Sequence, residues 1–163
     1  MMNRKILQNG LKLLAGEILF TCFVFSQVPA DHDALLNGEG MGMAAYAEVN
    51  GYPGPKHVLD LANDLQLSPP QKKAIQDVYD QTKTRAKELG ERIVSVEEEL
   101  NQAFAAGLVS DKSIRETVDQ IEKLRARLRT VHYAAHLKTR SLLTTDQLEV
   151  YKRLQRAGSK AGH

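Results

Sequence analysis

Two histidines, His132 and His136, lie four residues apart in a stretch with helical periodicity. This spacing places both imidazoles on one face of a helix, where they can share one metal ion. No glutamate follows His132, so the general base of the zinc-protease motif His-Glu-x-x-His is missing. Two imidazoles need a further ligand, and His57 and Asp60, on one face of an earlier helix, are the candidates. We therefore predict that these four residues could hold Zn, Ni, Co or Cu, with ordinary surface histidines as the alternative.

The sequence lacks the residue patterns that other kinds of chemistry require. The chain has no Gly-rich phosphate loop, and no Ser, His and acidic residue at a spacing that suggests a catalytic set. Its single cysteine, Cys22, lies in a segment that we expect to be removed, which leaves no thiol. The run Lys123–Arg129 is basic but has no interleaved aromatic residue, and export would separate it from nucleic acid. We expect no enzyme activity, no nucleic-acid binding and no required cofactor.

Charge is divided between the two halves of the chain beyond residue 30. Residues 31–110 hold 7 basic and 13 acidic residues, whereas residues 111–163 hold 12 and 6. Such a split suits two helices that lie against each other, or a polarised surface. If the chain folds back on itself midway, Arg125–Arg129 come opposite Glu88 and Glu91. Local pairing on a solvated face is therefore one expected role of these charges.

Apolar residues at alternating spacings of three and four predict two long helices. The first contains Ile75, Tyr79, Thr82, Ala86, Leu89, Ile93, Val96 and Leu100. The second contains Ile114, Val118, Ile121, Leu124, Leu128, Val131 and Ala135. Gly107 is expected to end the first helix, and Ser110 or Asp111 to cap the second. Because the connection is short, the two helices must be antiparallel.

The predicted fold class is all-α: a long antiparallel helical hairpin with short flanking helices, forming a dimer. A short helix over residues 57–65 precedes the hairpin, a fourth helix follows it, and the helical domain spans residues 57–157. Residues 158–163 are expected to form a disordered tail. Since a two-helix seam cannot enclose a core, apolar surface must stay exposed or be buried against a partner.

The first 30 residues have the pattern of a secretory signal peptide. Arg4 and Lys5 supply positive charge, residues 18–25 are apolar, and Val28–Ala30 offers small residues at a cleavage site. We predict export to the periplasm, with an uncleaved segment that anchors the chain to the inner membrane as the alternative. Residues 31–56 are rich in glycine and proline and are predicted to form a flexible linker.

A short box occurs twice, as Leu67-Ser-Pro-Pro-Gln71 and as Leu143-Thr-Thr-Asp-Gln147. Each has a leucine, a hydroxyl residue, two variable residues and a glutamine. This is the pattern of a capping box, in which the hydroxyl accepts from the third helical N–H and the glutamine reaches back to the cap N–H. Each box therefore predicts the start of a helix.

The two boxes, together with the export signal, resemble the LTxxQ motif of the Spy/CpxP family of periplasmic proteins. The matching residues are Leu67, Ser68 and Gln71 in the first box, and Leu143, Thr144 and Gln147 in the second. The resemblance covers about residues 57–157. It implies a small all-helical stress chaperone, with CnrX-like and ZraP-like heavy-metal sensors among the relatives.

By this resemblance, a thin dimer would offer apolar and basic side chains to unfolded envelope proteins without using ATP. The basic residues available for client binding are Arg115, Lys123, Arg125, Arg127 and Arg129. The resemblance also implies an envelope-stress signalling partner. In the metal-sensing relatives paired helical histidines are ligands, so a periplasmic metal-binding or metal-sensing protein is the alternative function.

Overall fold

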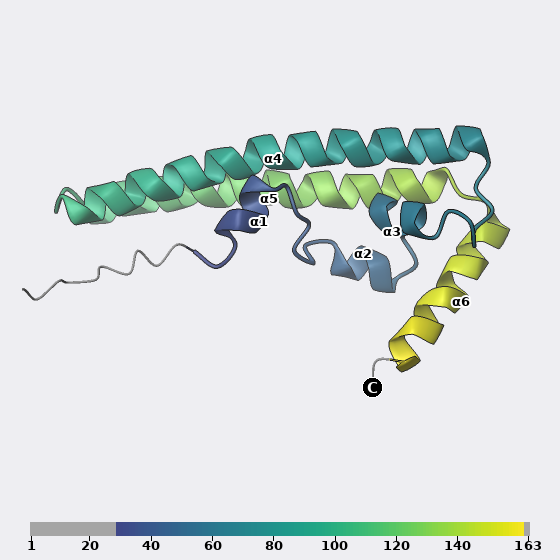
Figure 1. Cartoon of the computed structure of the whole chain (residues 1–163). Helices are drawn as coiled ribbons and strands as arrows, with labels where there is room; N and C mark the ends of the chain where they lie inside the picture. Colours follow the sequence, from purple (N-terminus) through teal and green to yellow (C-terminus); the bar gives the residue numbers. More distant parts are fainter. Residues whose placement is uncertain (1–28, 162–163) are drawn as a thin grey trace, which may run out of the picture.

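The computed structural model describes residues 29–161, and the elements in this range are all helices (Figure 1). They are α1 (His32–Leu36), α2 (Ala45–Val49), α3 (Pro55–Asp60), α4 (Pro69–Ala105), α5 (Asp111–Ser141) and α6 (Thr145–Ala161). The helices α4, with 37 residues, and α5, with 31 residues, pack side by side as the predicted hairpin. The expected signal peptide lies outside the described residues except for Pro29 and Ala30.

The seam of the hairpin is the predicted one over most of its length. Its buried members are Leu35, Ala86, Leu89, Ile93, Val96, Ile121, Leu124 and Leu128. All of them except Leu35 come from the two predicted stripes, because residues three and four apart share one helix face. Burial of each large aliphatic side chain contributes roughly 1.5–3 kcal/mol.

The turn between the long helices also follows the sequence. Helix α4 ends at Ala105, and Gly107 takes a positive φ of 67° that glycine adopts without strain. Ser110 caps α5, and its hydroxyl accepts a hydrogen bond from the N–H of Ser113 at 3.2 Å. The turn is therefore a tight reversal that forces the helices to be antiparallel.

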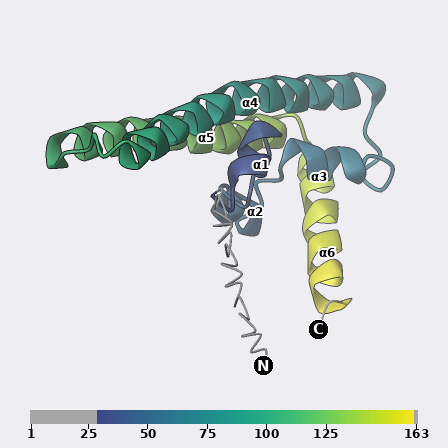
Figure 2. The ribbon, with the colours of Figure 1, turned by 60° about the vertical axis from the view of Figure 1, so that its left-hand side comes forward.

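A second core lies at the other end of the hairpin, where α3 and α6 meet it. Its buried side chains are Val58, Leu65, Ile75 and Tyr151, with Leu67 and Leu143 of the two boxes packed around them. Figure 2 shows α6 leaving this end of the hairpin beside α3, on the same side as α1 and α2. The short helices therefore supply the third layer that two helices alone lack.

Residues 31–56 differ from the flexible linker that we expected. They carry α1 and α2, and Leu35 and Ala44 keep only 2% and 6% of their surface exposed. Gly90 of α4 explains how α1 docks so closely, because a Cβ at this position would overlap the carbonyl oxygen of Leu35. Glycines therefore serve here for close approach and for turns rather than for flexibility.

Two predicted boundaries also shift. The helix expected over residues 57–65 begins at Pro55 and ends at Asp60, and turns lead on to Leu65. Helix α6 runs to Ala161, so it enters the stretch that we expected to be a disordered tail. Of the helices between residues 29 and 161, none combines the length and the apolar character needed to cross a membrane. The dimer stays a prediction.

Candidate functional site

Both predicted capping boxes form. In the first, Ser68 Oγ accepts from the N–H of Gln71 at 3.4 Å, and Gln71 Oε1 accepts from the N–H of Ser68 at 3.1 Å. In the second, Thr144 Oγ1 accepts from the N–H of Gln147 at 3.3 Å, and Gln147 Oε1 accepts from the N–H of Thr144 at 3.0 Å. The predicted starts of α4 and α6 are thus confirmed.

The two boxes also contact each other, which their separation in sequence does not reveal. Gln71 Nε2 donates to Gln147 Oε1 at 2.9 Å, and Gln147 Nε2 donates to Gln71 Oε1 at 3.2 Å. The remaining donors reach the carbonyls of Leu142, at 2.9 Å, and Leu65, at 3.2 Å. Every amide proton is therefore paired, and the glutamines tie the two helix starts together. The geometry gives the motif a structural role.

A cluster of polar side chains surrounds Glu48, which no sequence pattern singled out. Its Oε1 accepts from His57 Nδ1 at 3.0 Å, from Gln155 Nε2 at 2.8 Å and from the hydroxyl of Tyr151. Its Oε2 accepts from the N–H of Gly54 at 3.3 Å and lies 3.6 Å from His136 Nδ1. One carboxylate of α2 thus joins α3, α5 and α6.

The electrostatics of this cluster follow from its burial and its hydrogen bonds. Burial alone would raise the pKa of Glu48, but the hydrogen bonds from His57 and Tyr151 outweigh it and the pKa is lowered. The hydrogen bond to Glu48 raises the pKa of His57. Burial, together with Glu48, raises the pKa of the Tyr151 hydroxyl. The cluster is therefore a charged carboxylate held by donors.

His132 lies nearby in a different setting. Burial, with a smaller contribution from His136, lowers the pKa of His132. Its Nε2 is buried and has no hydrogen-bond partner among the described residues, and its ring lies against Gly40. A groove of about 1020 Å³ joins this histidine to His57, His136 and Glu48, with Met41 and Met43 also in its lining.

The four predicted metal ligands do not converge on one point. Asp60 pairs with Lys56 at 2.7 Å instead. His136 Nδ1 lies 2.6 Å from the carbonyl oxygen of Tyr52, which can only accept, so this nitrogen carries the proton. His57 Nδ1 likewise donates to Glu48. Among residues 29–161, no three or more His, Cys, Asp and Glu side chains are grouped so that they could hold a metal ion.

The predicted client-binding residues differ in their surroundings. Arg125 is held in ion pairs with Asp31, at 2.5 Å, and with Glu97, at 3.2 Å, which makes it part of the fold. Lys123 and Arg127 lie about 200° round the helix from Arg125, at 100° per residue. With Arg92 of α4 they line a hollow of about 310 Å³, together with Glu116, Gln120 and Leu124. We call this hollow the basic groove.

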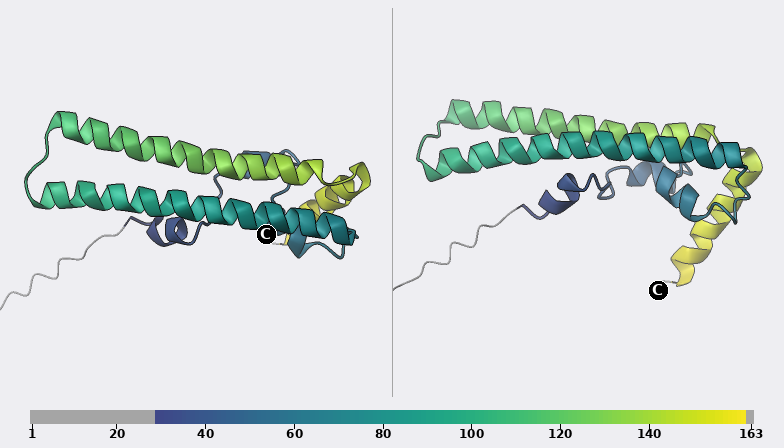
Figure 3. Two further views of the ribbon diagram at one scale, coloured as in Figure 1. Left: turned by 90° about the horizontal axis from the view of Figure 1, so that it is seen from above. Right: turned by 45° about the horizontal axis from the view of Figure 1, so that its top comes forward.

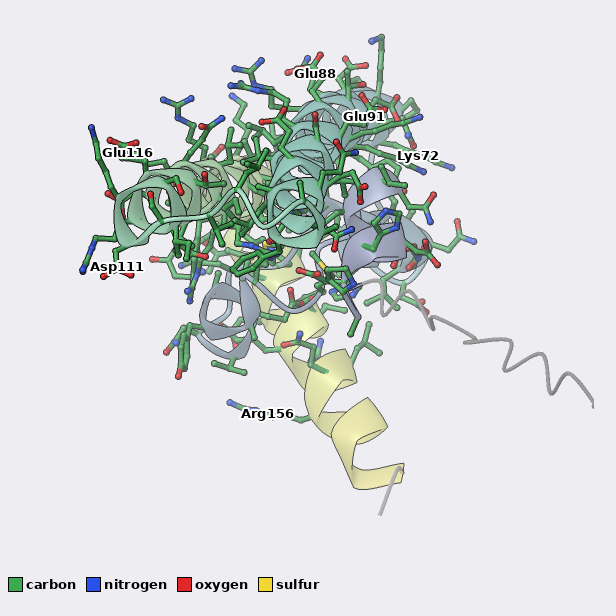
Figure 4. All side chains as sticks on the ribbon, turned by 90° about the vertical axis from the view of Figure 1, so that its left-hand side faces the viewer. Lys72, Glu88, Glu91, Asp111, Glu116 and Arg156 are labelled. Atoms are coloured by element: carbon green, nitrogen blue, oxygen red, sulfur yellow. The ribbon has the colours of Figure 1, made fainter. Side chains whose placement is uncertain are left out.

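None of the three cations of the basic groove makes an ion pair within residues 29–161. Of the other predicted residues, Arg115 lies 4.0 Å from Asp111, and Arg129 lies over the ring of Tyr133, 5.7 Å from its centre. Glu88 and Glu91 do not pair with Arg125–Arg129 as expected. They project on the side of the hairpin opposite α6 (Figure 4) and pair with cations of α4 itself.

The tip of the hairpin, residues 98–120, extends beyond the short helices (Figure 1). Seen from above, neither long helix is covered there by another element (Figure 3). Phe104, Leu108 and Val118 are exposed by 53%, 78% and 41%. The tip therefore carries exposed apolar side chains, and the three cations of the basic groove lie just outside it, at positions 92, 123 and 127.

We compared the chain with models of known protein families, with curated proteins and with solved structures, and none of these matches it. The resemblance to the Spy/CpxP family stays a prediction.

Proposed function

We propose that this protein is a periplasmic, ATP-independent chaperone or envelope-stress adaptor that binds unfolded proteins and acts as a homodimer. The supporting observation is that the half of the hairpin nearer the turn has both cations without ion-pair partners and exposed apolar side chains. Arg92, Lys123 and Arg127 line the basic groove without ion-pair partners among the described residues, and exposed apolar side chains lie on the adjoining tip. Cations steer an acidic segment to the surface, and apolar contact then holds it.

Residue roles follow from this geometry. Lys123 and Arg127 are the predicted client-binding residues that remain available, and Arg92 joins them. Arg115 and Arg129 are exposed and add positive charge to the same part of the hairpin. Arg125 acts indirectly, because its ion pairs hold Asp31, and with it α1, against the hairpin. An envelope-stress signalling partner would use the same exposed surface.

The proposal is tested with the mature protein and several unrelated unfolded clients, in the absence of nucleotide. Light scattering should show that near-stoichiometric protein delays aggregation. Added salt should weaken the effect, because charge interactions are screened beyond ~8–10 Å at ordinary ionic strength. Aggregation curves that the protein leaves unaltered for every client would contradict the proposal.

A second candidate function is metal binding or sensing, and one observation favours it. His57, His132 and His136 line one groove, together with Met41 and Met43. Since Nδ1 of His57 and of His136 are donors, the ligand atoms would be Nε2. Calorimetry with Zn, Ni, Co and Cu should then show binding that weakens as the pH falls, because protons compete with the metal for the imidazole nitrogens. Equal heats for wild type and for the variant H132A/H136A would exclude this function.

A further inference from the structure

Residues 38–51 form a strap along the side of the hairpin that faces down in Figure 1. Its helix α2 has no buried residue, and Tyr46 and Val49 keep 73% and 76% of their surface exposed. Gly38, Gly42 and Gly51 have positive φ angles of 64°, 70° and 76°, so the chain turns sharply on either side of α2. Helix α2 therefore opens at low free-energy cost, whereas the residues just before it are held by Ala44, which is 6% exposed, and by Met43, which packs against the core of the hairpin.

Polar contacts hold the strap in place. Glu48 accepts from donors on α3 and α6, and the N–H of Gly54 adds to them. At the end of the strap, Arg140 donates to the carbonyl oxygen of Gly51 at 2.6 Å. One carboxylate thus provides most of the link between α2 and the rest of the molecule.

The strap also forms one wall of the large groove. Met41, Met43 and Ala44 line it from the strap, while Tyr79 and Lys83 line it from α4. Lys83 makes no ion pair with another residue of the described range. Removal of the strap would leave an apolar surface bordered by this lysine and by the donors that now serve Glu48.

We propose that the strap is a displaceable occupant, and that its site accepts an apolar peptide segment carrying one carboxylate. The strap itself has this composition, because residues 41–49 read Met-Gly-Met-Ala-Ala-Tyr-Ala-Glu-Val. The inference rests on the proposed function, since the occupant would be an unfolded client segment.

Charge complementarity selects the carboxylate. His57, Tyr151, Gln155 and the N–H of Gly54 all point donors at one position. An apolar side chain here would leave these donors without an acceptor, which is costly for a buried group such as the Tyr151 hydroxyl, and glutamine would offer one acceptor oxygen in place of two. A carboxylate satisfies them and also forms charge-assisted hydrogen bonds, which are stronger than neutral ones.

The test uses two labelled peptides with the sequence of residues 40–51, one with glutamate and one with glutamine at position 48. Fluorescence anisotropy measures their binding to the wild-type protein and to E48Q, in which the strap is loosened. We expect the glutamate peptide to bind E48Q about tenfold more tightly than it binds wild type. The glutamine peptide should gain much less.

Since E48Q changes the strap residue that the donors hold, a second variant that keeps Glu48 is needed. Arg140→Gln loosens the end of the strap and leaves the donors around Glu48 unchanged, so it should also increase binding of the glutamate peptide. Equal binding of both peptides to all three proteins, or no binding to any, would overturn the proposal. Loss of the helical fold in both variants would do so too, because a displaceable strap is dispensable for the hairpin.

The same proteins separate this inference from the proposed function. If the peptides bind as expected but no client aggregation is delayed, the proposed function fails and the displaceable strap remains. If aggregation is delayed equally by all three proteins and no peptide binds, the strap proposal fails alone.

Discussion

The two ends of the hairpin are built from the same pair of helices, yet they differ in what covers them. At the base, α3, α6 and the strap add a third layer, and Ile75 and Tyr151 are almost completely buried. At the tip no other described element covers the helices, and Phe104 and Leu108 stay exposed. Since both ends have heptad stripes, the difference comes from the covering elements. The base therefore supplies stability, and the tip is free to bind a partner.

The largest effect is expected from variants that disrupt the seam shared by both ends of the hairpin. A charge at Ile93→Asp or Leu128→Asp would be buried without a partner, which costs several kcal/mol, comparable to the total stability of a small domain. Thermal melting by circular dichroism should show loss of the cooperative transition. Leu137→Asp is the control, because Leu137 is 60% exposed and should change stability by less than about 0.5 kcal/mol. Unchanged melting of both seam variants would show that the seam is misplaced.

The next effect concerns the N-terminal segment on the hairpin. Gly90→Ala adds a Cβ that overlaps the Leu35 carbonyl oxygen, so α1 must move. We expect a net loss of about 1–3 kcal/mol, as for other overpacking, although alanine favours a helix over glycine. Hydrogen exchange should become faster in residues 32–37. An exposed position of the same helix, Ser95→Ala, should leave that exchange unchanged. A Gly90→Ala protein with wild-type protection would show that α1 does not dock there.

A smaller effect tests the contact between the two boxes. Gln71→Ala and Gln147→Ala each leave amide or carbonyl groups unpaired, at a cost of about 1–3 kcal/mol. Because the two side chains bond to each other, the double variant should lose less than the sum, with a coupling of about 0.5–3 kcal/mol. Urea unfolding of the four proteins measures it. Strict additivity would mean that each glutamine only caps its own helix.

Much of the fold could be predicted because it follows from local patterns. The stripes placed Ile93 and Leu128 in the seam, and both boxes placed helix starts, since period and capping depend on nearby residues. The ion pairs of Arg125 with Asp31 and Glu97 could not be predicted by folding the chain about its turn, because this register placed Glu88 and Glu91 opposite Arg125–Arg129. Glu91 lies two residues from both buried Leu89 and Ile93, about 200° round the helix, and so points away from the seam.

The strap and the hydrogen bonds of Glu48 that hold it could not be predicted from the sequence. Glu48 meets Tyr151 and Gln155 across about a hundred residues, and no local spacing encodes such a contact. The glycines of residues 31–56 suggested flexibility, yet Gly38 and Gly51 serve as turns with positive φ. The one signal in the sequence was Glu48, the single acidic residue of the otherwise apolar stretch 41–49. Its role becomes clear only from the positions of its partners in the structure.

The smallest expected effect is the pH dependence of the free energy that holds the strap on the hairpin. The raised pKa of His57 means that its stabilising pair with Glu48 is complete below about pH 6.5 and is lost as the pH rises through the folded pKa. The lowered pKa of Glu48 means that its contribution is lost only as the pH falls below its usual value of 4.5. Proteolysis within residues 38–51 should therefore be slowest between these limits.

The control for this prediction is His57→Asn, which should remove the rise in proteolysis on the alkaline side. His132 acts in the opposite direction, because its lowered pKa makes protonation below about pH 6.5 unfavourable to the fold. The test therefore follows cleavage of the strap and not global melting. A flat cleavage profile in the wild type would contradict the role assigned to His57.

The central claim is that the outer hairpin binds clients through the basic groove. Its most direct test compares the variant R92Q/K123Q/R127Q with K72Q/K138Q/R156Q, which removes as much positive charge at exposed sites away from the groove. Light scattering of one acidic unfolded client, at fixed ionic strength, measures the delay of aggregation by each protein. We predict that the groove variant loses most of the delay, with unchanged melting, while the control keeps it. An equal loss in both variants, or none in either, would contradict the account.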